Sequence, residues 1–186
     1  ATLGGNLCHA VPSADFAVAL IALDAEVKLL AVSGERILPL EAFFQDVRRT
    51  ALERDELLVE IRIPHLSAGS ACAFQRTARS VVDIALVNAA VRLTIDEQER
   101  VSQARIALGA VAPIPIRSRA AEEMLLGKRL DEIDEVTLDQ VGERAAVDTR
   151  PISDVRTSAA YRRHVSKILV KRGLDQVLDE LAGEPA

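Results

Sequence analysis

The order of secondary-structure patterns in the second half of the chain constrains its fold more than any single motif. Three strand-like runs come first, over residues 72–78, 84–95 and 101–111, and only helix-like patterns follow them. The polar segment DEQER at 96–100 joins the last two runs and predicts a hairpin. Because strands followed by helices are typical of α+β proteins, we predict a three-stranded antiparallel sheet followed by helices.

Serine residues mark the starts of two predicted helices in this second half. Ser118 can cap a helix over 119–126, and Ser158 can cap a long helix over 159–181. Apolar residues at helical spacing support the long helix, whereas 130–147 is a weaker candidate.

Several charged residues on these helices are expected to lie on solvated faces. They include Glu122 and a basic cluster formed by Arg162, Arg163 and Lys167. The same basic cluster could instead dock a partner subunit.

The first half predicts a smaller mixture of helix and strand. Its patterns are a buried helix over 14–24, strands over 25–32, 35–40 and 56–64, and a short helix or loop over 41–52. The segment HLSAGSA at 65–71 is small and polar, so we predict a linker there between two domains, at 1–64 and 72–182.

Composition excludes several classes of function. The formal net charge is −5, which argues against a nucleic-acid surface. No apolar run reaches the roughly 20 residues that span a bilayer. Two cysteines make no disulfide framework, so a reducing cytoplasm is the simplest setting. The Cys and His residues, at Cys8, His9, His65 and Cys72, do not have the spacing of a metal site, so we predict none.

The chain opens with ATLGGNLCHAVPSAD, residues 1–15, and this segment suggests a phosphate-bearing cofactor. A Gly-Gly pair lets the backbone approach a phosphate, and successive N–H groups in such a turn bind anions. Thr2 and Asn6 add side-chain donors, and Asp15 could bind hydroxyls. An ordinary turn is the alternative, since neither the dinucleotide fingerprint nor a phosphate-loop motif is present. With no initiator Met, we expect the chain to start inside its own binding site.

Several longer strings resemble one family, the FAD-binding medium subunit of the molybdenum hydroxylases, which includes carbon monoxide dehydrogenase and xanthine dehydrogenase. The resemblance covers nearly the whole chain in order. The strings are TLGGNLCHAVPSAD, ALDAEV, ELLVEIRIP, DIALVNAAVRL, RIALGAVAPIPIRS and SAAYRRHVSKILVKRGL. It implies that 1–64 is the second part of an FAD-binding domain and that 72–182 is the small C-terminal domain.

The resemblance also implies cofactor-binding residues. Asp15 corresponds to a carboxylate that binds the ribityl or ribose part of FAD, and Leu58 to an apolar position against the flavin. Gln75 falls where some members have a lysine close to the flavin ring. The phosphate-binding loop corresponds to Thr2, Leu3, Gly4, Gly5 and Asn6.

The resemblance implies an electron-transfer role without a catalytic acid or base. Electrons would pass from a molybdenum-cofactor large subunit, through 2Fe–2S clusters on a small subunit, to FAD and then to an external acceptor. A dimer of heterotrimers is expected, with molybdopterin and iron–sulfur on the partners. Since only one of two Gly-rich loops is here, we expect this chain alone to bind FAD poorly. The alternative is a docking or assembly module without its own cofactor.

Overall fold

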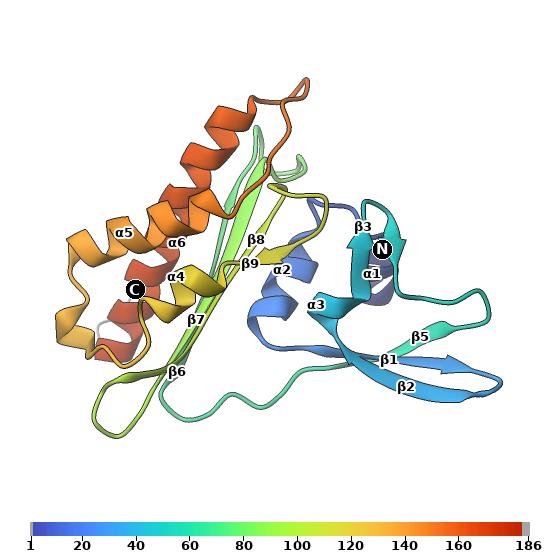
Figure 1. The fold of residues 1–186 in the computed structure, drawn as a ribbon, viewed down its shortest axis with the longest axis horizontal. Helices are drawn as coiled ribbons and strands as arrows, with labels where there is room; N and C mark the ends of the chain where they lie inside the picture. The colour runs from blue at the N-terminus through green and yellow to red at the C-terminus, as the bar shows by residue number, and fades with distance from the viewer. Residues whose placement is uncertain (1, 184–186) are drawn as a thin grey trace.

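Two units, each centred on its own antiparallel sheet, make up the structure (Figure 1). It is a computed structural model that describes residues 2–183. The mixture of antiparallel sheets and helices confirms the α+β prediction.

The first unit packs two helices against a three-stranded sheet of order β2-β1-β5. The predicted helix and the three predicted strands are confirmed, whereas the 41–52 region holds a one-turn helix and also two short strands. The elements are α1 Leu3–His9, α2 Asp15–Ala22, β1 Glu26–Ala31, β2 Gly34–Pro39, α3 Leu40–Phe43, β3 Phe44–Asp46, β4 Arg49–Thr50 and β5 Leu57–Arg62.

The second unit is an antiparallel sheet of order β6-β7-β8-β9 covered on one face by helices. The three predicted strands are confirmed, and a two-residue strand, β9, is added at one edge. The elements are β6 Ser70–Thr77, β7 Val87–Ile95, β8 Val101–Gly109, β9 Ile116–Arg117, α4 Arg119–Glu123, a 3-10 turn Leu130–Glu132, α5 Glu135–Val147 and α6 Ala159–Ala182. Ser158 caps α6 as predicted, accepting from the Tyr161 N–H at 3.2 Å.

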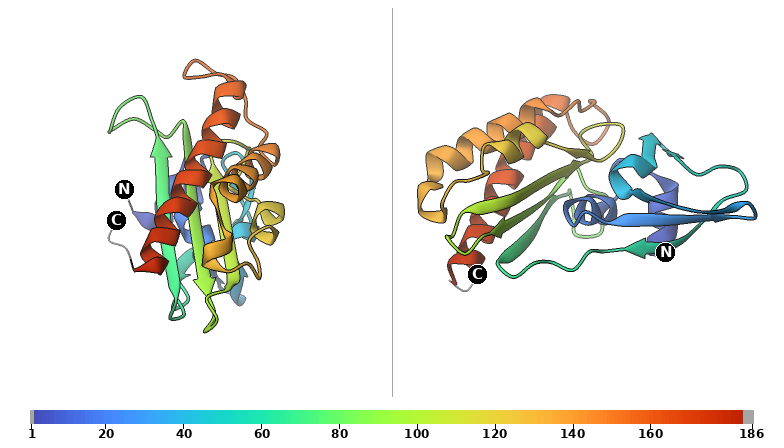
Figure 2. Two further views of the ribbon diagram at one scale, coloured as in Figure 1. Left: turned by 90° about the vertical axis from the view of Figure 1, so that its left-hand side faces the viewer. Right: turned by 60° about the horizontal axis from the view of Figure 1, so that its bottom comes forward.

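Strand β7 is buried on both faces, and its polar residues Asn88, Arg92 and Thr94 are buried along with the apolar ones. Val87, Val91 and Leu93 belong to the core shared with α5 and α6, whereas Ala90 packs into the core of the first unit. Figure 2 shows α6 lying across one face of this sheet and α2 against the other. The α2 helix is therefore the element that joins the two units.

Close packing at this junction depends on a small residue in β8. A Cβ added to Gly109 would lie 2.5 Å from Val18 Cγ2 of α2 and 2.2 Å from Asn88 Oδ1. Beside it, the Ala110 N–H donates to the Pro12 carbonyl at 2.7 Å, which ties the chain before α2 to the end of β8. The first unit is thus held against the sheet by both packing and a backbone hydrogen bond.

A cluster of charges after α2, the junction cluster of Asp24, Arg92, Arg105 and Arg117, also joins the units. Asp24 has a left-handed backbone, with φ of 53°, and its carboxylate accepts from Arg105 Nε at 2.8 Å and from Arg92 Nη2. Arg117 Nη1 lies 3.6 Å from the same carboxylate. Burial alone would raise the pKa of Asp24, but the hydrogen bonds from Arg105 and Arg92 outweigh it and lower that pKa.

The expected solvation of the charged helix residues is wrong at two positions. Glu122 is buried, because its carboxylate accepts from the Ile106 N–H at 2.9 Å and pairs with Arg117 Nη2 at 2.6 Å. Arg162 is also buried, and it donates to the Ala110 carbonyl and to Asp154 Oδ2. Each charge is buried together with its partner, as buried charges require.

Candidate functional site

The Gly-Gly segment starts a helix, so the expected loop conformation is wrong. Thr2 is the N-cap of α1: its Oγ1 accepts from the Gly5 N–H at 3.1 Å, and its carbonyl accepts from the Asn6 N–H at 3.0 Å. A threonine at this position satisfies helix-start donors, which offsets the poor helix propensity of two glycines. The N–H groups of Leu3 and Gly4 belong to this first turn and have no intrahelical partner.

The structure brings this helix start together with Leu58, as the resemblance implied. A Cβ on Gly4 would meet the Leu58 side chain of β5 at 3.6 Å, so the two segments are in near contact. Leu58 is half-buried and packs against the core of the first unit. The backbone N–H donors at the start of α1 therefore lie next to the apolar side chain of Leu58.

Asn6 has a polar atom without a partner. Its Oδ1 is buried and accepts no hydrogen bond from residues 2–183. Leaving a buried acceptor unpaired is costly, so such an atom marks a place where a ligand group fits. Free N–H groups and the apolar Leu58 match what the phosphate and ring parts of FAD need from one side of a site, and the Asn6 Oδ1 can accept from an N–H or O–H group of a ligand.

Asp15 lies at the start of α2 and is held by the second unit. Its Oδ1 accepts from Asn88 Nδ2 at 2.5 Å, and its Oδ2 accepts from Arg76 Nε at 3.0 Å. Its side chain nevertheless stays 39% exposed, so part of the carboxylate is open to a ligand. Arg76 and Asn88 are residues that sequence reasoning missed.

Gln75 points away from Asp15. Its Nε2 donates to Gln176 of α6 at 2.9 Å, which places it on the helix-covered face of β6. Successive side chains of a strand point to opposite faces, so Arg76 faces α2 instead. The side chain at 75 therefore does not lie on the face of the sheet that carries Asp15.

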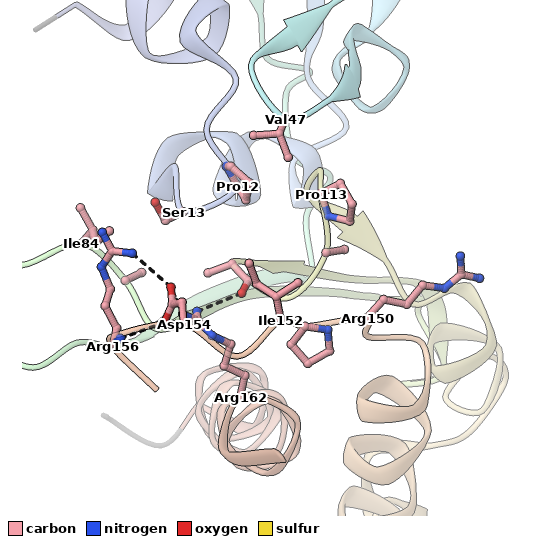
Figure 3. A pocket seen from close by; sticks show the side chains of 14 residues that line it. Pro12, Ser13, Val47, Ile84, Pro113, Arg150, Ile152, Asp154, Arg156 and Arg162 are labelled. Atoms are coloured by element: carbon pink, nitrogen blue, oxygen red, sulfur yellow. Dashed lines mark hydrogen bonds and ion pairs between the residues drawn. The ribbon is translucent and has the colours of Figure 1, made fainter. Parts of the chain in front are cut away.

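A cavity of about 270 Å³ lies where the two units meet, just before α2 (Figure 3). Its lining is largely apolar and includes Pro12, Ile84 and Pro113. Arg162 reaches its floor from α6 and donates to the Ala110 carbonyl and to Asp154 Oδ2, both at 3.1 Å. These two part-buried acceptors explain why Arg162 is not on a solvated helix face.

Asp154 supplies the negative charge that balances Arg162 at the floor of the cavity. Burial alone would raise its pKa, but the backbone N–H groups of Arg156 and Thr157, together with Arg162, lower the pKa to about 2. Figure 3 shows Asp154 between the Arg156 and Arg162 side chains. The aspartate is therefore ionised near neutral pH and neutralises the buried Arg162.

The cysteines have no features of reactive thiols. Burial raises the pKa of both Cys8 and Cys72, which keeps them as thiols at neutral pH. Within the described residues, no group of three Cys, His, Asp or Glu side chains could hold a metal ion. In that same part of the chain, no helix is both long and apolar enough to cross a membrane.

Comparisons with known proteins agree with this arrangement along nearly the whole chain. Residues 1–66 match the FAD binding domain in molybdopterin dehydrogenase, and residues 72–177 match the CO dehydrogenase flavoprotein C-terminal domain.

Curated relatives include two oxidoreductase subunits. The alpha subunit of the 6-hydroxypseudooxynicotine dehydrogenase complex of Paenarthrobacter nicotinovorans is 34% identical over 95% of this chain and 59% of its own length. The carbon monoxide dehydrogenase medium chain of Hydrogenophaga pseudoflava is 32% identical over 94% and 59%. This chain therefore spans about 60% of the length of such relatives.

Solved structures extend the likeness to the fold. Carbon monoxide dehydrogenase from Hydrogenophaga pseudoflava superposes with a TM-score of 0.89 and 33% identity, over 95% of this chain and 60% of that one. Quinoline 2-oxidoreductase from Pseudomonas putida 86 gives 0.87 and 32%, over 97% and 61%. With both family models matched in order, the chain belongs to the FAD-binding flavoprotein family of the CO and xanthine dehydrogenases.

Proposed function

We propose that this chain is the FAD-binding part of an electron-transfer subunit in a molybdenum-dependent hydroxylase or dehydrogenase. Electrons would arrive from iron–sulfur clusters and leave to an external acceptor. The observation that carries the proposal is the orphaned Asn6 Oδ1 beside a helix start that faces Leu58. Such a site offers groups that bind a cofactor but no acid–base pair for chemistry of its own.

The residues of this chain would bind and orient FAD, and bound FAD would supply the redox chemistry. The Asn6 Nδ2 group and the first-turn N–H groups at Leu3 and Gly4 would donate to the phosphates, with Thr2 and Gly5 holding that turn in place. Asp15 would accept a hydrogen bond from a ribityl or ribose hydroxyl, and Leu58 would contact the flavin.

The same proposal assigns a role to each segment of the chain and to its partner subunits. Residues 1–64 would carry the FAD-binding contribution, 65–71 the linker, whose last two residues lie in β6, and 72–182 the C-terminal domain. A large subunit with the molybdenum cofactor and a small iron–sulfur subunit would be the partners, as a dimer of heterotrimers in the cytoplasm. The name of one relative, a medium chain of carbon monoxide dehydrogenase, supports such a multi-subunit arrangement.

The site assignment is tested by the double variant Asn6→Ala with Asp15→Ala in the intact subunit. We expect the flavin content of the purified protein to fall, because both the Asn6 amide and a carboxylate ligand are lost. Asp175→Ala, at an exposed position of α6, is the control and should keep full flavin content. Normal flavin occupancy in the double variant would overturn the assignment.

The wider function is tested by cofactor analysis of the intact protein purified with its natural partners. FAD, iron–sulfur and molybdopterin found together would support the proposal. Flavin alone would indicate a flavoprotein outside such a chain of carriers. No cofactor at all would favour an assembly module.

A further inference from the structure

Arg76 connects the two units at the proposed FAD ligand Asp15. Its Nε donates to Asp15 Oδ2 at 3.0 Å, and its Nη2 donates to the carbonyl of Asp83, in the loop after β6. We propose that Arg76 is a positioning residue of the flavin site: it fixes the Asp15 carboxylate and supplies the positive charge beside it. This inference rests on the proposed function, because it assumes that Asp15 binds FAD.

The Asp15 carboxylate is held in one orientation and can still accept further hydrogen bonds. Each of its oxygens accepts one hydrogen bond, from Asn88 and Arg76, and both donors come from adjacent strands of the second unit. A carboxylate has about four acceptor positions, so about two remain on a side chain that is 39% exposed. A carboxylate held in this way can accept from a ligand hydroxyl without first losing rotamer freedom.

The shape of the guanidinium is what makes this arrangement possible. Two of its nitrogens bind two different segments at once, α2 through Asp15 and the loop through Asp83. The third, Nη1, makes no hydrogen bond to any described residue, and the side chain is 25% exposed. A lysine ammonium is a point charge on a flexible stem. Lysine at this position would keep the positive charge but could not bond Asp15 and the Asp83 carbonyl at the same time.

Arg129 is the matched control that the second unit provides. Its Nε also donates to a carboxylate, Asp131 Oδ1 at 3.1 Å. Arg129→Gln removes the same kind of ion pair without touching Asp15.

The test uses the intact subunit in its complex, with FAD affinity and flavin reduction potential as readouts. Arg76→Gln should weaken FAD binding by about two- to tenfold, because the Asp15 side chain would then have to be immobilised when FAD binds. It should also lower the flavin potential, because the Asp15 carboxylate is left uncompensated and disfavours the more negative reduced flavin. Arg76→Lys should weaken binding to a similar extent but retain the potential. Arg129→Gln should change neither.

A double-mutant cycle separates positioning from a general effect on folding. In an Asp15→Asn background, Arg76→Gln should have little further effect on FAD affinity, because its partner is already neutral. Additive losses would overturn the inference, and so would an Arg76→Gln protein with unchanged affinity and potential. If the wild-type complex binds no FAD, the proposed function itself fails, which is a distinguishable result.

Discussion

Replacing Asp24 by Asn removes the central charge of the junction cluster with little change to the backbone. Asp24 has a φ of 53°, a left-handed conformation that asparagine adopts as readily as aspartate. The amide is also similar in size to the carboxylate. Any loss of stability can therefore be assigned to the ion pairs rather than to strain.

The structure indicates that Asp24→Asn lowers the free energy of unfolding substantially. Arg92, one of the partners of Asp24, has a side chain only 5% exposed, so the variant leaves a nearly buried charge without its carboxylate. Breaking a buried pair costs roughly 3–5 kcal/mol. Because Asp24 itself is 33% exposed, solvent screening reduces the cost, and we expect a loss of about 2–3 kcal/mol in the free energy of unfolding.

Urea unfolding at several pH values is the assay. The pKa of Asp24 is lower in the folded chain than in the unfolded chain, so its contribution is present above about pH 4 and is lost as the pH falls through the folded pKa. The difference between wild type and Asp24→Asn should therefore narrow at low pH. Glu60→Gln, which breaks the exposed pair with Arg62, should have no measurable effect. A negligible difference at neutral pH, or one that does not change with pH, would refute the reasoning.

Two further stability predictions concern packing and capping. Gly109→Ala should destabilise the chain by about 1–3 kcal/mol in urea unfolding, because the new Cβ would overlap Asn88 and Val18, whereas Gly4→Ala has room beside Leu58 and should be tolerated. Ser158→Ala should cost about 1 kcal/mol by removing the acceptor for the Tyr161 N–H, and a loss equal to that of an exposed Ser33→Ala substitution would contradict the capping role.

Elements with a strong periodic pattern could be predicted from the sequence. The α6 helix and strand β7 are long, and each repeats its apolar residues at the spacing of its own structure. The strands β3, β4 and β9 have two or three residues, too few for a pattern to show. Their pairing is decided by neighbours that are distant in the sequence.

The buried charges could not be predicted, because their partners lie in other elements. Arg162 is buried by Asp154 and by the carbonyl of Ala110, which no spacing within α6 reveals. Glu122 likewise accepts from the backbone of β8. A charged residue at a helix position next to the apolar face was the only available signal.

The candidate site was predicted in part. The residues of the Gly-Gly segment and Leu58 do lie together, but the loop is a helix start, because a favourable cap at Thr2 outweighs the glycines. Alternation within 72–78 does place Gln75 and Arg76 on opposite faces. Which of those faces meets α2 is a property of the tertiary structure, so Arg76 could not be identified from the sequence.

Asp15 and Asp24, at the two ends of α2, fix the position of the first unit relative to the second. Asp15 is the first residue of α2 and Asp24 follows its end, and each binds an arginine of the second sheet, Arg76 on β6 and Arg92 on β7. The apolar face of α2 packs against β7 and β8 between these two anchors. A helix attached at both ends and packed between them can neither rotate about its axis nor slide along the sheet. The orientation of Asp15 therefore depends on the junction cluster at Asp24 as well as on its own partners.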